Sequence, residues 1–126
     1  MDTFYIKATP STPYVNFDPV SGRLDIKGRS IPENSVAFYK PLLNVLDEFA
    51  KSPVEQITVI IQLEYYNSSS AVCLLNFLKK LETLKDKIAD ISIEWYYEEE
   101  DEDSLTAGEN FQSILSLPVK IIKIAC

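Results

Sequence analysis

The chain has 126 residues, with 12 Lys and Arg residues against 19 Asp and Glu residues and no His, so its formal net charge is -7. Six of the acids form one run, residues 98–103, and without that run 13 acids face 12 bases. Because no Lys and Arg residues cluster, binding to nucleic acid or to an anionic membrane is not expected. The absence of His excludes Ser-His and Cys-His catalysis, a His general base and His-ligated metals.

The size and composition are typical of one globular domain over residues 1–126, because 46% of the residues are hydrophobic and 11% are aromatic. The two cysteines, Cys73 and Cys126, have no partners at zinc-site spacing, and we interpret both as free thiols in a reducing compartment. The first residues lack the pattern of a secretion signal, and no apolar run approaches the roughly 18 residues of a membrane span. The expected location is therefore the cytoplasm.

Alternation of apolar and polar side chains predicts three short strands in the first part of the chain. They cover residues 4–8, 15–18 and 23–27. Between the second and third strands, residues 18–22 read Asp-Pro-Val-Ser-Gly, which are residues that a hairpin turn uses. The sequence therefore begins with a small set of adjacent strands.

A helix is predicted to follow. Ser30 and Glu33 have the spacing of a capping box, with Ser30 as the N-cap. Pro41 lies inside the helical pattern and should kink the helix or mark the start of a second segment, and residues 51–53 should end it. The apolar stripe that defines this helix consists of Val36, Tyr39, Leu42, Leu43, Leu46, Phe49 and Ala50.

The rest of the chain alternates strands with helices. A fourth strand at residues 57–63 is apolar on one face, and Ile60 on its other face marks it as central. Further elements are predicted as a helix at about 69–87, a strand at 91–97, a helix at 103–115 and a strand at 119–125. The order is β-β-β-α-β-α-β-α-β.

This order predicts the fold class. Strands joined through a helix should be parallel, with right-handed crossovers. A sheet covered by helices on both faces would have continuously apolar strands, whereas most strands here alternate. We therefore predict a mixed α/β (α+β) domain with about six strands in one mixed sheet and with helices mainly on one face.

A hydroxyl-rich segment, Glu-Tyr-Tyr-Asn-Ser-Ser-Ser at residues 64–70, joins the fourth strand to the second helix. Asn and Ser are preferred helix N-caps, so spacing alone favours a cap with no further role. Three consecutive hydroxyls nevertheless exceed what a cap needs. The unpaired amides and positive dipole end of a helix start tolerate phosphate well, so a hydroxyl there is a sensible phosphorylation site.

The second candidate segment is Trp95-Tyr96-Tyr97 followed by the acidic run. A core strand and a solvated charged loop would explain it. A calcium loop is not supported, because the required ligand spacing and the Gly at its sixth position are missing. No Gly-rich phosphate loop, nucleophile elbow or Cys-x-x-Cys occurs. We therefore assign no catalytic residue, metal or cofactor, and an enzyme that uses the acidic run is the weakest alternative.

The two segments follow strands predicted to be parallel, so they should meet at one edge of the sheet. Ser68 and the acidic run should flank one surface, with tyrosines between or behind them. Aromatic side chains among polar groups are typical of protein-binding surfaces. The expected partner-binding residues are Glu64, Tyr65, Tyr66, Asn67, Ser69, Ser70, Trp95, Tyr96, Tyr97, Glu98, Asp101 and Asp103.

Four stretches of the sequence resemble the SiaC-like family of bacterial regulatory phosphoproteins. They are residues 6–13 with 15–18, residues 28–34 (Gly-Arg-Ser-Ile-Pro-Glu-Asn), residues 63–70, and residues 95–98 with the acidic tail. The family in turn resembles the STAS fold of anti-sigma-factor antagonists. In that class, a Ser or Thr at the start of the helix after a central strand is phosphorylated by a kinase, and a phosphatase reverses it.

The resemblance implies a non-enzymatic partner switch. The family has Thr at the phosphorylated position, which matches Ser68 here and leaves Ser69 as a competitor. The implied partners are a kinase with a histidine-kinase-like ATPase fold, a PP2C-type phosphatase and a diguanylate cyclase, which links the protein to cyclic di-GMP signalling and biofilm formation. The alternative from the residues alone is a constitutive adaptor whose acidic edge, residues 98–103, docks a basic partner.

Overall fold

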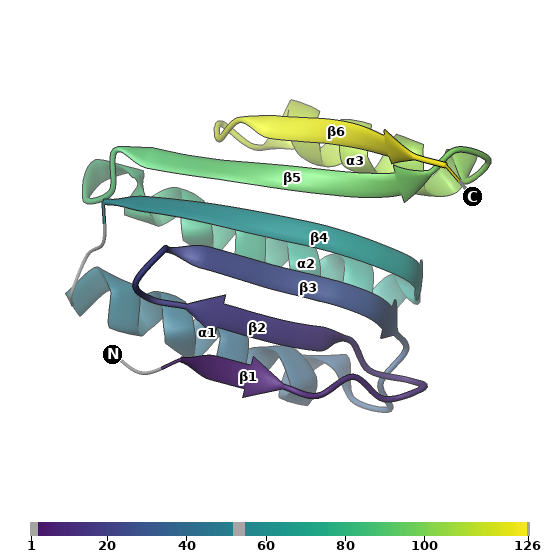
Figure 1. Cartoon of the computed structure of the whole chain (residues 1–126), viewed down its shortest axis with the longest axis horizontal. Coiled ribbons are helices and arrows are strands. Elements are labelled where there is room, and N and C mark those ends of the chain that lie inside the picture. The colour runs from purple at the N-terminus through teal and green to yellow at the C-terminus, as the bar shows by residue number, and fades with distance from the viewer. Residues whose placement is uncertain (1–2, 52–54, 126) are drawn as a thin grey trace.

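The computed structural model describes residues 3–51 and 55–125. Its elements follow the predicted order (Figure 1). The predicted helix stop at residues 52–53 and Cys126 lie outside the described residues. The strands are β1 Phe4–Ile6, β2 Tyr14–Asp18, β3 Arg23–Ser30, β4 Gln56–Tyr66, β5 Asp90–Glu98 and β6 Val119–Ile124. The helices are α1 Ser35–Lys51, α2 Ser68–Glu82 with a 3-10 turn η1 at Thr83–Asp86, and α3 Glu102–Ile114.

The six strands form one mixed sheet in the order β1-β2-β3-β4-β5-β6. The first three are antiparallel neighbours, and β3, β4, β5 and β6 are parallel. All three α-helices lie behind the sheet in Figure 1, so one face is covered and the other is open. This arrangement confirms the predicted mixed sheet with helices on one face. It also places the carboxyl ends of β4 and β5 side by side.

The hydrophobic core lies between the sheet and the helices. On β4, Ile57, Val59 and Ile61 are at most 1% exposed, as the alternating pattern predicts for the covered face. The open face is polar: Arg23 Nε lies 3.1 Å from Asp25 Oδ2 on the same strand. None of the helices among the described residues is long and apolar enough to cross a membrane.

Ser30 is not the N-cap of the first helix, so the predicted capping box is wrong. Ser30 ends β3, where it pairs with Tyr66 of β4, and α1 begins five residues later at Ser35. The side chain that serves the start of α1 is Asn34, whose Oδ1 accepts a hydrogen bond from the Ala37 amide at 3.1 Å. The capping-box spacing therefore does not decide the role of Ser30, because Ser30 is held in the sheet by its pairing with β4.

Two other details of α1 differ from the sequence pattern. The helix runs through Pro41 without a break, so a separate second segment does not form. Val36, counted in the apolar stripe, is 72% exposed, whereas Tyr39 and Leu46 are each 1% exposed. The core-facing stripe is therefore narrower than predicted.

Trp95 on β5 anchors α3 to the covered face of the sheet. Its indole Nε1 donates a hydrogen bond to the Ser104 carbonyl at 2.9 Å, and its ring packs edge-on against Phe111 with centroids 5.2 Å apart. Gly108 lies directly over the indole, because a Cβ at this position would be 2.6 Å from Trp95 Cδ1. These contacts determine where the acidic start of α3 lies.

We expect Gly108→Ala to destabilise the protein even though alanine is the better helix former. Overpacking a buried contact costs about 1–3 kcal/mol, which exceeds the roughly 1 kcal/mol that alanine gains in a helix interior. Urea unfolding should therefore show a net loss, whereas Thr106→Ala, at an exposed position of the same helix, should leave stability unchanged or higher. Equal stability of both variants would contradict the close packing on Trp95.

Candidate functional site

The start of α2 is capped by Asn67, which follows directly after β4. Asn67 has an extended backbone, and its Oδ1 accepts a hydrogen bond from the Ser70 amide at 2.9 Å. This geometry confirms the predicted N-cap and assigns it to the Asn. The three serines that follow are therefore not needed as the cap, and their hydroxyls are available for other contacts.

Ser70 belongs to a buried network of hydroxyls that joins three elements. Its Oγ donates to the Ser30 carbonyl and accepts from Ser30 Oγ, both at 2.9 Å. The Tyr39 hydroxyl of α1 lies 2.7 Å from Ser30 Oγ. The network therefore fastens the start of α2 to the end of β3 and to α1.

Ser69 and Ser68 differ in what their hydroxyls contact. Ser69 Oγ lies 2.7 Å from Ser35 Oγ and donates to Asn67 Oδ1 at 3.1 Å. Ser68 is exposed, and within the described residues no hydrogen bond to its hydroxyl is found. Of the three serines, Ser68 is thus the one whose hydroxyl is both accessible and unengaged.

The acidic run divides into a turn and a helix start, so it is only partly the solvated loop expected. Glu98 ends β5, and Asp101 caps α3 by accepting a hydrogen bond from the Ser104 amide at 3.0 Å. Glu102 and Asp103 occupy the first turn of α3, where negative charge is favoured by the positive end of the helix dipole. Half of the run therefore has a local structural role.

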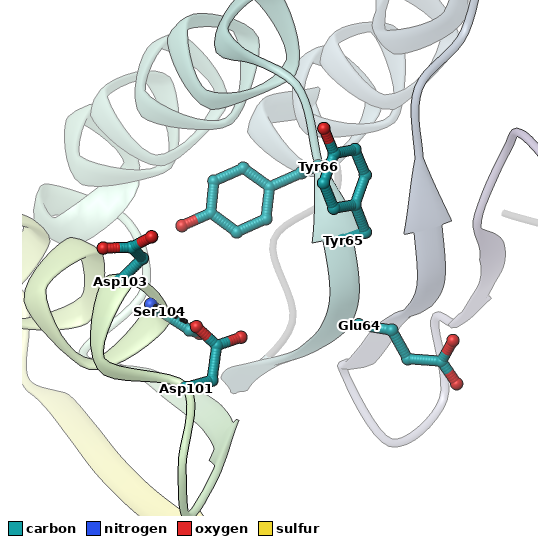
Figure 2. A pocket seen from close by; sticks show the side chains of 6 residues that line it. All are labelled: Glu64, Tyr65, Tyr66, Asp101, Asp103 and Ser104. Carbon is teal, nitrogen blue, oxygen red and sulfur yellow. Dashed lines mark hydrogen bonds between the residues drawn. The ribbon is translucent and has the colours of Figure 1, made fainter.

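A cavity of about 190 Å³ lies between the end of β4 and the start of α3. The expected meeting of the two segments occurs here, because Tyr66 and the start of α3 line the same cavity. In Figure 2, the Tyr66 hydroxyl points toward the Asp103 carboxylate, whereas the Glu64 carboxylate points away from both aspartates. Burial raises the pKa of Tyr66, and the negative charges of Asp101 and Asp103 raise it further. The lining residues are Glu64, Tyr65, Tyr66, Asp101, Asp103 and Ser104.

Some expected partner-binding residues do not face this surface. Trp95 is 1% exposed and Ser70 is fully buried, so neither presents its side chain to a partner. Tyr96 lies on the open face of the sheet, where its hydroxyl donates to Glu94 Oε1 at 2.8 Å, a bond that raises the Tyr96 pKa. Tyr97 is partly buried against the core. Side-chain alternation along β5 separates Tyr96 from its two neighbours.

An apolar groove between α2 and α3 was missed by sequence reasoning. It has a volume of about 260 Å³, and two of its apolar side chains, Val72 and Ile114, are 59% and 52% exposed. Val72 lies one helical turn beyond Ser68, on the same side of α2. The sequence did offer one indication of this groove, because Val72 and Ile114 are apolar but do not belong to a core-facing stripe. The groove is lined by Ala71, Val72, Leu75, Ala107, Asn110, Phe111 and Ile114.

The fold and the site define a small mixed α/β protein with an accessible serine at a helix start and an acidic, aromatic cavity beside it. The sequence model described as SiaC family regulatory phosphoprotein matches residues 6–124. The chain therefore belongs to the SiaC family.

Comparisons with individual proteins agree with this membership. An uncharacterized protein of Pseudomonas aeruginosa strain UCBPP-PA14 is 28% identical over 121 residues, which cover 96% of each chain. The crystal structure of the diguanylate cyclase SiaD in complex with its activator SiaC, from P. aeruginosa, contains a similar chain with a TM-score of 0.88 and 27% identity, covering 96% of this chain and 99% of that chain. Apo-SiaC from the same organism has a TM-score of 0.87 at 27% identity, with coverage of 97% and 99%.

The buried hydroxyl network leads to a pH-dependent prediction. Burial raises the pKa of Tyr39 to about 12, from 10.0 for an ordinary tyrosine. In the unfolded chain Tyr39 ionises near pH 10, whereas in the folded protein it stays protonated to higher pH. The stability that depends on the protonated Tyr39 hydroxyl is therefore fully present below pH 10. It is lost as the pH rises toward about 12, and it amounts to roughly 2–3 kcal/mol.

We therefore expect Tyr39→Phe to flatten the alkaline loss of stability. At pH 7 the variant should be less stable by about 1 kcal/mol, because it lacks the hydrogen bond to Ser30. Between pH 10 and about 12, urea unfolding should show its stability falling less than that of the parent protein. Tyr5→Phe, at a 58% exposed position, is the control and should keep the parent pH dependence. Parallel curves for the parent and Tyr39→Phe would contradict the shifted pKa.

Proposed function

We propose that this protein is a non-enzymatic, cytoplasmic partner switch whose effector is a diguanylate cyclase. Unmodified, the edge that carries Ser68 binds and activates the effector, and phosphorylation of Ser68 releases it. A kinase with a histidine-kinase-like ATPase fold adds the phosphate, and a PP2C-type phosphatase removes it. The observation that carries the proposal is the accessible, unengaged Ser68 hydroxyl at the start of α2, in a chain of a regulatory phosphoprotein family.

The choice of effector is supported by the related complex. The SiaC of P. aeruginosa is described as the activator of the diguanylate cyclase SiaD, and the similar chain covers nearly all of this one. The same role here would connect the protein to cyclic di-GMP signalling and biofilm formation. The apolar groove that begins one turn beyond Ser68 would supply a contact surface of the kind found in protein interfaces.

The charge at this edge explains how a phosphate could act. A phosphoserine adds about -1.5 to -2 charge at neutral pH. Asp101 and Asp103 already approach Tyr66, which lies two residues before Ser68. At about 8 Å and an effective dielectric of 20 to 80, each unit-charge pair repels by roughly 0.5–2 kcal/mol. A partner packed over Ser68 would also have to remove water from the phosphate, which adds to the cost.

The contacts of the serines favour Ser68 over its competitor. Phosphorylation of Ser69 would break its contacts with Ser35 and Asn67, whereas the Ser68 hydroxyl has no such bond to lose within the described residues. Incubation with the cognate kinase and ATP, followed by mass spectrometry, should therefore locate the phosphate on Ser68. Ser68→Ala should remove most of it and Ser69→Ala should not. Phosphate found only outside residues 67–70 would refute the assignment.

The regulatory step can be tested by binding to the cognate cyclase. Ser68→Ala should bind as the parent does, whereas Ser68→Asp should bind about tenfold more weakly or worse, because a partner packed over this position would have to remove water from the new charge. Ser21→Asp is the matched control, because it introduces the same charge in the exposed turn between β2 and β3, at the opposite end of the sheet. Calorimetry or surface plasmon resonance measures both.

Other outcomes of this experiment would favour the constitutive adaptor. Unchanged affinity for both Ser68 variants would leave the switch without a mechanism. If neutralising residues 98–103 abolished cyclase binding while Ser68→Asp had no effect, the acidic edge alone would carry the interaction. The adaptor, not the switch, would then be the function.

A further inference from the structure

The cavity between the end of β4 and the start of α3 is surrounded by hydrogen-bond acceptors. The carboxylates of Asp101 and Asp103 and the Tyr66 hydroxyl line it, and Ser104 is also one of its lining residues (Figure 2). No Lys or Arg is among its lining residues, and neither aspartate forms an ion pair with a described residue. The site therefore suits a cationic group that can donate several hydrogen bonds.

Ser104 gives a second, independent indication that a ligand belongs here. Its residue is 2% exposed, and its Oγ is the single buried side-chain polar atom of the described residues without a hydrogen-bond partner. The Ser104 amide is bonded to Asp101 and its carbonyl to Trp95, so only the hydroxyl is unsatisfied. Buried hydroxyls are nearly always paired, and Ser104 is one of the residues that line this cavity.

The geometry favours an organic cation over a metal ion. One oxygen of Asp101 is already used to cap α3, which reduces what the aspartates can offer a metal. Among the residues that the structure describes, no group of three or more His, Cys, Asp or Glu side chains could hold a metal ion. Ca²⁺ takes about six to eight oxygen ligands, whereas Mg²⁺ keeps several waters and is usually bound through one or two carboxylates together with substrate phosphates.

Within organic cations, the cavity fits a guanidinium better than an ammonium. A guanidinium is planar and presents five N–H donors in a fixed fork, which matches a carboxylate and nearby hydroxyl oxygens together. Tyr65 and Tyr66 add aromatic surface, on which arginine stacks more readily than lysine. The Asp103 carboxylate, with no partner among the described residues, could accept two parallel bonds.

We propose that this cavity binds the guanidinium group of an arginine side chain presented by a partner protein. The surrounding acids disfavour free arginine, because its α-carboxylate would meet them, whereas a peptide-borne arginine has no such charge. The proposal does not rest on the phosphorylation of Ser68. It also differs from a diffuse acidic edge, because it requires Asp103 and Ser104 and not residues 98–100.

The test is an NMR titration of the isotope-labelled protein with N-acetyl-arginine amide. Amide resonances of residues 101–105 and of Tyr66 should shift and saturate at millimolar concentration. The citrulline analogue, which has the same shape but no charge, should cause no saturating shift, and the lysine analogue should bind more weakly. Equal shifts with the citrulline analogue, or tighter binding of free L-arginine, would overturn the proposal. The same shifts with MgCl₂ in place of the arginine analogue would also overturn it.

Variants separate recognition from structure. Asp103→Asn should weaken binding of the arginine analogue about tenfold, whereas Glu109→Gln, at an exposed position farther along α3, should not. Ser104→Ala should also weaken binding while leaving the thermal unfolding midpoint unchanged or higher, because it removes a hydroxyl that has no partner in the fold. Ser68→Ala should bind the analogue normally. Loss of stability without loss of binding in Ser104→Ala would show that the hydroxyl is structural and would refute its role.

Discussion

The paired hydrogen bonds between Ser30 and Ser70 hold the start of α2 against the end of β3, and the geometry of the site depends on them. Ser70 uses its hydroxyl both to donate to and to accept from Ser30, so α2 has little freedom to rotate about its axis at this point. That fixed rotation buries Ser70 and leaves Ser68 exposed. The buried contact thus removes Ser70 from the surface, and the contacts of Ser69 with Ser35 and Asn67 leave Ser68 as the unengaged hydroxyl.

Trp95 holds the start of α3, which carries part of the acidic run, in the same way as Ser30 holds the start of α2. It is one of the largest buried side chains, and it positions α3 through one hydrogen bond and through contact with Gly108 and Phe111. Because β4 and β5 are parallel neighbours, these two anchors bring both helix starts to the same end of the sheet. These buried contacts therefore position a surface on which acidic side chains, aromatic rings and the accessible Ser68 hydroxyl lie close together.

The net charge of -7 is concentrated at this end of the molecule. Its local role is to cap and stabilise α3, through Asp101 and the acids of the first turn. The same carboxylates raise the pKa of Tyr66 across the cavity. One set of charges therefore serves the helix and at the same time defines what kind of group the cavity can accept.

Sequence periodicity was sufficient for the element order, the parallel strands and the single covered face, because these follow from short-range alternation and from the handedness of crossovers. It also identified Asn67 as a possible cap and predicted that Tyr66 would meet the acidic run. The same reasoning failed for Ser30, because its partners, Tyr66 on the neighbouring strand and Ser70 at 40 positions along the chain, are distant in sequence. No local spacing rule can anticipate a contact of that range.

The sequence by itself thus determined the fold class, the concentration of charge and the presence of hydroxyls at a helix start. Only the tertiary structure decided that Ser69 is held by Ser35, that Trp95 is buried and that Ser104 borders a cavity with its hydroxyl unpaired. The physical reason is that accessibility and hydrogen-bond satisfaction are properties of packed neighbours. Those neighbours come from different strands and helices, and they meet only after the sheet and its helices have assembled.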